Sequence, residues 1–153
     1  MDIDTARHRV NIRDEAQVTA LWDWVEAERG LPDFLVNIVF QHTGPYPNEL
    51  HAAAARAAVV NMTRTLAAEW GEKGILVNAV GPGFIETDAI KGYGEGRGVE
   101  NPMIQHLPVR RVGQPREIGE AVAYLFSPVA DYVTGQVLVV DGGAALLDSW
   151  STI

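Results

Sequence analysis

The chain has 153 residues, 47% hydrophobic and 21% charged, an ordinary balance for one globular core, so we expect a single domain over residues 1–153. Its formal net charge of -8 argues against a nucleic-acid partner, because phosphate binding relies on clustered Lys and Arg. The absence of cysteine excludes disulfides, thiol nucleophiles and thiolate metal sites.

The sequence gives no indication of a membrane partner. No apolar stretch is long enough to span a bilayer, and Met1–Asp4 lacks the basic start and apolar core of a secretory signal. We therefore expect no membrane association and a cytoplasmic location.

The first predicted element is a helix from Glu15 to Arg29. Asp14 and Gln17, three residues apart, have the spacing of a helix cap and its capping-box partner. The apolar residues that follow repeat at helical spacing: Val18, Leu21, Trp22 and Val25.

A strand and a loop are predicted next. Gly30 and Pro32 end the helix, and the mostly apolar run Phe34–Phe40 is typical of a strand covered on both faces. The segment Thr43–Asn48 contains one Gly and two Pro and is predicted to be a loop.

A long helix is predicted from Glu49 to Trp70, where Gly and Pro are absent and alanines are dense. Small side chains also allow another helix to approach closely. Gly71 and Gly74 end this helix before a strand predicted over Ile75–Val80.

The segment Glu86–Leu107 contains four glycines and a proline, too many for one long stable element, and we expect a mobile flap. Pro115 then opens a helix before a strand over Val137–Val140. The apolar face of that helix comprises Ile118, Ala121, Val122 and Leu125. Helices alternating with apolar strands indicate a parallel α/β sheet.

Four pieces of sequence occur in a specific order: Leu66–Gly71 (LAAEWG), Val77–Gly83 (VNAVGPG), Gly113–Pro115 (GQP) and Thr134–Gln136 (TGQ). With these pieces the chain resembles the short-chain dehydrogenase/reductase family from Val10 to Gly143. Around His51–Ala58 it is most similar to the trans-2-enoyl-CoA and 2,4-dienoyl-CoA reductase branch.

The resemblance implies a truncated Rossmann-like, doubly wound α/β fold with three or four parallel strands and flanking helices. The family's glycine-rich phosphate-binding turn has no counterpart, because the chain joins the pattern only at Val10–Ile12. A second gap lies at Phe34–Phe40, which begins like the family's fourth strand and ends like its fifth.

The resemblance also locates the family's proton-transfer positions. Its tyrosine and lysine fall on Ala52 and Arg56, and its serine falls near Val39 or Phe40. Arg56 keeps a positive charge and could orient a ribose, but a guanidinium could not relay a proton.

The catalytic candidates are therefore Arg56, with Tyr46 and His51 as the nearest groups that could donate a proton. For Tyr46 and His51, surface or packing roles are the favoured alternative. The chain's four histidines lack ligand-like spacing, so we expect no metal site.

Cofactor contacts are implied for the loop Pro82–Thr87, which in relatives lies along the nicotinamide end of NAD or NADP. The positions carried over are Pro82, Gly83, Ile85 and Thr87, together with Asn11 near the adenine. The alternatives are an ordinary turn after a strand and, for Asn11, a simple strand-end residue.

Two functions stay open at this level. The resemblance implies an oxidoreductase that uses NADH or NADPH to reduce an acyl-CoA-like enoyl thioester. The missing turn and the altered positions favour a non-catalytic assembly or binding module instead. In both cases an uncovered sheet edge and the alanine-rich helix predict a homodimer or larger homo-oligomer.

Overall fold

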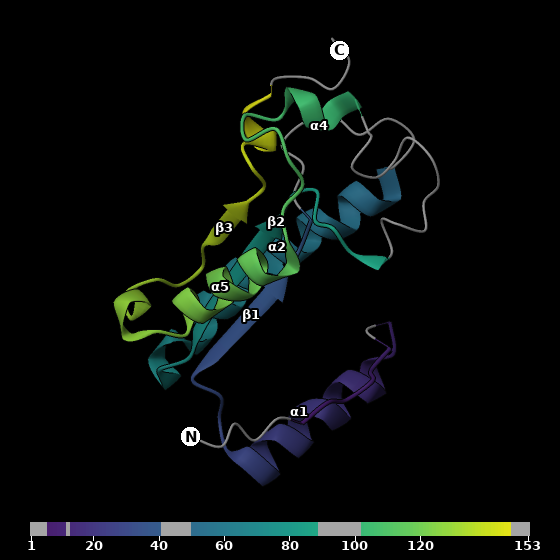
Figure 1. Ribbon diagram of the computed structural model, residues 1–153. Coiled ribbons are helices and arrows are strands. Elements are labelled where there is room, and N and C mark those ends of the chain that lie inside the picture. Colours follow the sequence, from purple (N-terminus) through teal and green to yellow (C-terminus); the bar gives the residue numbers. More distant parts are fainter. Residues whose placement is uncertain (1–5, 12, 41–49, 89–101, 148–153) are drawn as a thin grey trace. The chain divides into compact units, whose positions relative to one another are not determined.

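The computed structural model describes residues 6–11, 13–40, 50–88 and 102–147 (Figure 1). The chain divides into two compact units, Met1–Asp33 and Phe34–Ile153, and each is described by itself.

The first unit contains helix α1 (Glu15–Arg29), which has the predicted bounds. The Asp14 carboxylate accepts a hydrogen bond from the Gln17 backbone N–H at 3.3 Å, and the Gln17 side chain accepts one from the Asn11 N–H at 3.0 Å. These contacts confirm the predicted cap. Gly30, with φ of 80°, ends the helix.

The second unit is built on a parallel sheet of three strands in the order β1 (Phe34–Ile38), β2 (Leu76–Pro82) and β3 (Val137–Val140). This confirms the predicted parallel α/β architecture and the bounds of the last strand. The other two strands end at different residues from those predicted, at Ile38 and Pro82. The prediction followed apolar residues, whereas the strand ends follow pairing: Pro82 still pairs with Val140.

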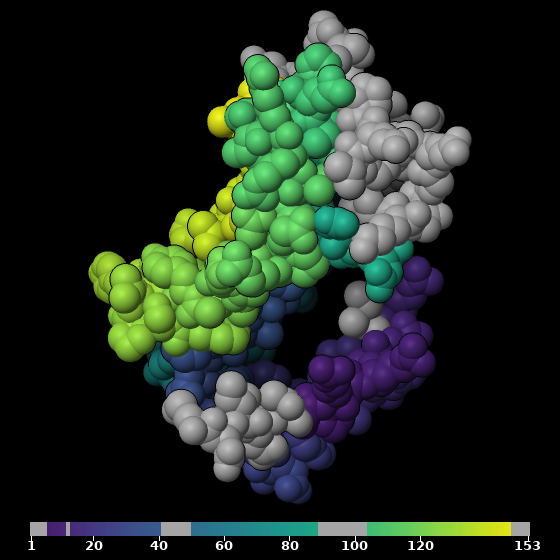
Figure 2. Space-filling view, viewed as in Figure 1, coloured from purple at the N-terminus to yellow at the C-terminus, as the bar shows by residue number. Residues whose placement is uncertain are grey.

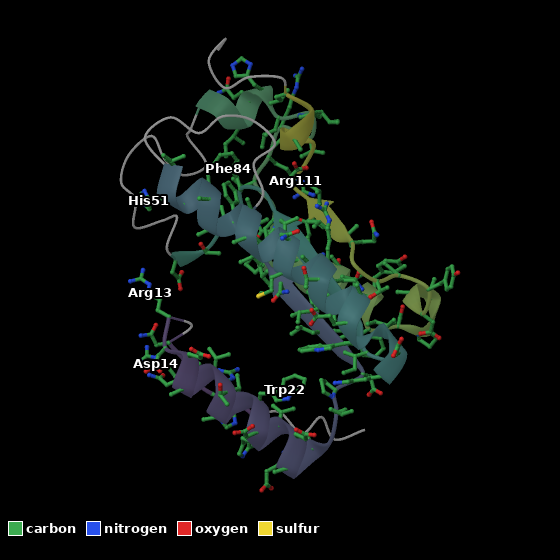
Figure 3. All side chains as sticks on the ribbon, turned by 180° about the vertical axis from the view of Figure 1, so that it is seen from behind. Arg13, Asp14, Trp22, His51, Phe84 and Arg111 are labelled. Carbon is green, nitrogen blue, oxygen red and sulfur yellow. The ribbon has the colours of Figure 1, made fainter. Side chains whose placement is uncertain are left out.

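Helices α2 (Leu50–Trp70) and α5 (Pro115–Leu125) cover opposite faces of this sheet (Figures 1 and 3). The predicted start of α2 at Glu49 lies outside the described residues. Helix α2 buries Ala67 against Ile75 and Val77. The predicted apolar face of α5 is confirmed, since Leu125 is buried and the other three members are half-buried.

Helix α4 (Pro102–His106) corrects the prediction of a mobile flap over the end of that segment. Ile104 and Leu107 are buried in a core cluster with Val112 and Ala144. Counting glycines missed the two apolar side chains that anchor this helix. The rest of the expected flap, residues 89–101, lies outside the described residues.

A buried amide joins β2 to the turn before β3. Asn78, 2% exposed, donates to the Val133 carbonyl at 2.8 Å and accepts from the Gln136 N–H at 3.0 Å. The turn after α5 protrudes on the face shown in Figure 2 and exposes Val129 and Tyr132. Within the described residues, no helix is both long and apolar enough to cross a membrane.

Candidate functional site

The loop after β2, Pro82–Thr87, lies at the carboxyl ends of the parallel strands, where ligands bind in open α/β sheets. The Gly83 N–H donates to the Val140 carbonyl at 3.0 Å, which joins the loop to the end of β3. Two more backbone bonds join it to Gly113: the Gly113 N–H donates to Phe84 at 2.8 Å, and its carbonyl accepts from Glu86 at 2.9 Å. The loop is therefore fixed from two directions.

These two bonds determine which backbone groups of the loop remain for a ligand. They flank Ile85, which forms an isolated parallel bridge with Gly113. In extended backbone, successive residues direct their N–H and C=O groups to opposite sides, so those of Ile85 point away from Gly113. Among the hydrogen bonds between described residues, none uses the N–H or C=O of Ile85.

Side chains at the start of α5 fasten the same loop. The Gln114 amide donates to the Glu86 carboxylate at 2.9 Å. Glu117 accepts from the Gln114 N–H at 2.7 Å and pairs with both Arg111 nitrogens, at 2.6 and 2.8 Å. The Arg111 hydrogen bonds, followed by the Gln114 N–H, lower the pKa of Glu117 to about 2.

Two glycines allow the close packing around the loop. A Cβ on Gly83 would lie 2.6 Å from the Cα of Asp141, and one on Gly113 would lie 2.6 Å from Cδ1 of Ile85. A cavity of about 100 Å³ borders the loop, with Phe84, Ile85 and the Arg111–Glu117 pair in its lining. The Asp141 carboxylate accepts from two following backbone N–H groups, so it caps the turn after β3.

The positions where the family resemblance places proton transfer lie on α2 and just after β1. Arg56 is half-buried, and its guanidinium carbon lies 5.0 Å from the centre of the Phe40 ring. Phe40 meets Phe84 of the loop edge-on at 6.3 Å. Ala52 is half-buried one turn before Arg56, and His51 is exposed at the start of α2, toward the same end of the unit as Phe84 (Figure 3).

The structure brings only some of the expected site residues together. Pro82, Gly83, Ile85 and Thr87 share the loop, and Arg56 reaches the loop through Phe40 and Phe84. Tyr46 lies outside the described residues. Asn11 lies in the first unit, where its side chain accepts from the Arg13 N–H at 3.1 Å. Sequence reasoning missed Gln114 and Glu117, although their i, i+3 capping spacing was visible.

No group of three or more side chains of the metal-binding types comes together in the described part of the chain. The expectation of no metal site therefore stays a prediction.

A family model described as enoyl-(acyl carrier protein) reductase matches residues 39–145. The chain belongs to the short-chain dehydrogenase/reductase family. That match covers the loop Pro82–Thr87, helix α2 with Ala52 and Arg56, and the start of α5. It confirms the family expected from the sequence.

Two relatives within this short-chain dehydrogenase/reductase family show how much of a complete member is present. The chain is 42% identical over 99 residues to the 3-oxoacyl-[acyl-carrier-protein] reductase FabG of Chlamydia muridarum, covering 65% of this chain and 39% of that protein. It is 45% identical over 106 residues to the peroxisomal 2,4-dienoyl-CoA reductase of Rattus norvegicus, covering 69% and 35%. The chain thus spans less than half the length of these relatives.

A solved structure shows the same fold. A 4-hydroxyisoleucine dehydrogenase mutant, complexed with NADH and succinate, superposes with a TM-score of 0.72 at 25% identity. The match covers 86% of this chain and 55% of that one. The second unit therefore has a Rossmann-like short-chain dehydrogenase/reductase architecture.

Proposed function

We propose that the chain binds the nicotinamide end of NAD or NADP at the loop Pro82–Thr87 and takes part in the reduction of an enoyl thioester. The backbone of Ile85 carries this proposal, because it presents one donor and one acceptor on the side away from Gly113. A carboxamide offers the complementary acceptor and donor. The NADH-bound structural neighbour and the acyl-reductase relatives support the assignment.

Two features of the loop fit the nicotinamide end of the cofactor: its backbone is already ordered, and it carries the Thr87 hydroxyl. The loop is fixed before any ligand binds, which lowers the cost of ordering it. The exposed Thr87 hydroxyl is proposed to lie near a phosphate. Asn11 remains a prediction from the resemblance.

In this proposal the bound nicotinamide supplies the hydride, and the protein supplies orientation. Arg56 is proposed to orient the ligand, since a guanidinium does not give up its proton at neutral pH. The proton must then come from another group, for which His51 and Tyr46 are the proposed sources. His51 is exposed and therefore in contact with solvent protons.

The second candidate is a non-catalytic binding module. It is favoured by Ala52, Arg56 and the neighbours Val39 and Phe40, because none of these side chains can transfer a proton in water near neutral pH. Both candidates include a homo-oligomer, since the outer face of α2 exposes alanines that suit close helix packing. A monomer by light scattering at micromolar concentration would contradict the oligomer. A cytoplasmic location and a single domain belong to this proposal as well.

Titration with NADPH and NADH, followed by nucleotide fluorescence, tests the nicotinamide site. We expect saturable micromolar binding, weakened about tenfold by Gly83→Ala, whose Cβ would lie 2.6 Å from the Cα of Asp141 and would displace the start of the loop. Gly119→Ala is the matched control, because nothing lies within 4 Å of a Cβ there. Absence of saturable binding to the wild-type chain would overturn the proposal.

Crotonyl-CoA added to the nucleotide-bound protein separates the two candidates. Oxidation of the nucleotide would support the reductase. Tight nucleotide binding without turnover would support the binding module.

A further inference from the structure

Arg56 differs from two other arginines of the second unit in having no acidic partner among the described residues. Arg111 pairs with Glu117 at 2.6 Å, and Arg116 pairs with Glu120 at 3.3 Å. In the part of the chain that the structure describes, Arg56 takes part in neither an ion pair nor a side-chain hydrogen bond. This is notable in a chain with net charge -8, where carboxylates are plentiful.

The contact with Phe40 stabilises the charge of Arg56 but does not use its hydrogen-bonding groups. An aromatic face attracts a cation through its quadrupole, at 5.0 Å here. A guanidinium has five N–H donors arranged in a planar fork that matches the oxygens of a carboxylate or phosphate. Arg56 as a residue is half-buried, so its side chain is partly shielded from solvent. An anion would restore the missing hydrogen bonds.

Among the described residues, those next to Arg56 leave room for such an anion. Side chains on a helix lean toward its N-terminus, so the long side chain of Arg56 extends over the preceding turn. Ala52 occupies that turn with only a methyl group. The start of α2 is accessible, since Leu50 is 82% exposed. The helix dipole adds a weak preference for negative charge at this end.

We propose that Arg56 is an oxyanion-binding residue that takes the carboxylate or phosphate group of a ligand at the carboxyl end of β1. Phe40 holds the guanidinium in place, and the Phe40–Phe84 contact joins this site to the loop after β2. Where the family resemblance places proton transfer, this chain binds a permanent negative charge. The inference does not require nucleotide binding at the loop.

NMR titration of the full chain with inorganic phosphate and, separately, with acetate tests the proposal. Sodium chloride is exchanged to keep ionic strength constant, and the Nε–Hε signal of Arg56 is followed, assigned by its loss in Arg56→Gln. We expect that signal to move in a saturable way with at least one anion. The stronger anion identifies the ligand group as phosphate or carboxylate. Saturation by neither anion would overturn the proposal.

Variants test whether the planar guanidinium of Arg56 and its contact with Phe40 are responsible for anion binding. Binding by the variants is followed through the backbone amide signals of Phe40 and Ala52, since the Nε–Hε signal is lost when Arg56 is replaced. Arg56→Lys keeps the charge without the planar fork and should weaken binding several-fold. Phe40→Leu should also weaken it while leaving the charge. Arg64→Gln, an exposed arginine on the same helix, is the matched control and should bind as the wild type does. Equal loss in Arg64→Gln and Arg56→Gln, with Arg56→Lys binding as the wild type does, would show a general charge effect and reject the site.

Discussion

The loop after β2 and the positions where the family resemblance places proton transfer differ in how much of the family's pattern they keep. The loop retains its sequence and is held by backbone hydrogen bonds to Val140 and Gly113. Where the resemblance places the family's tyrosine and lysine, the chain has Ala52 and Arg56, and the serine falls near Val39 or Phe40. A site built from backbone groups survives many side-chain substitutions, whereas a proton relay is lost when its side chains change.

The largest loss of folding stability is expected from a substitution where the loop contacts the end of β3. Gly83→Ala would place a Cβ 2.6 Å from the Asp141 backbone, which cannot move without disturbing the turn. Overpacking of this kind costs about 1–3 kcal/mol, and we expect the upper end because backbone is involved. The free energy of unfolding in urea measures it. Gly119→Ala, in an open helical position, should be neutral or stabilising. Equal stability of both variants would show that the loop is not held there.

A smaller loss of folding stability is expected from a substitution on α2, the helix that carries Ala52 and Arg56. Thr63, fully buried on α2, accepts from the Asn37 amide at 3.0 Å and donates to the Val59 carbonyl at 2.9 Å. Thr63→Val keeps the shape but leaves the Asn37 amide without this acceptor, at a cost of about 1–2 kcal/mol. The exposed Thr65→Val is the control and should change the urea midpoint little. Similar losses in both variants would mean that valine, not the lost bond, is responsible.

The smallest change in folding stability is expected from the exposed hydrogen bonds and ion pair at the start of α5, next to the loop. The pKa of Glu117 is lowered to about 2 from a usual value near 4.5, so its contacts stabilise the fold above about pH 4.5. That contribution is lost as the pH falls toward 2. Urea unfolding measured across this range should show a weaker pH dependence in Glu117→Gln. Glu120→Gln should keep the wild-type slope, and an unchanged slope in both variants would contradict the role of Glu117.

The parts of the fold with local signals were predictable from sequence. The Asp14 cap, the face of α5 and the last strand depend on residues close together in the chain, and each was confirmed. Helix α4 was missed because its stability comes from Ile104 and Leu107 packing against distant residues. The predicted strand over Ile75–Val80 began one residue before β2 and ended two residues before the end of β2, because that end is set by its pairing with β3.

The site residues that the family resemblance implies, the loop and Arg56 among them, stay a prediction. The contacts that these residues make could not be predicted. The contact of Arg56 with Phe40 joins a helix to a strand end, and the bridge of Ile85 with Gly113 joins segments far apart in the chain. No spacing pattern in the sequence encodes either contact.

The topology of the sheet also has a consequence for how the protein folds. Neither pair of neighbouring strands forms a hairpin, and both parallel pairings join distant residues, such as Phe34 with Leu76 and Ala79 with Val137. Each pairing closes a long loop before it gains any contact, so chain closure is expected to limit the folding rate. Helix α2 can form early from local hydrogen bonds, while the apolar β1 stays unpaired until β2 joins it. During that interval aggregation competes with folding, and dilute conditions should favour the native chain.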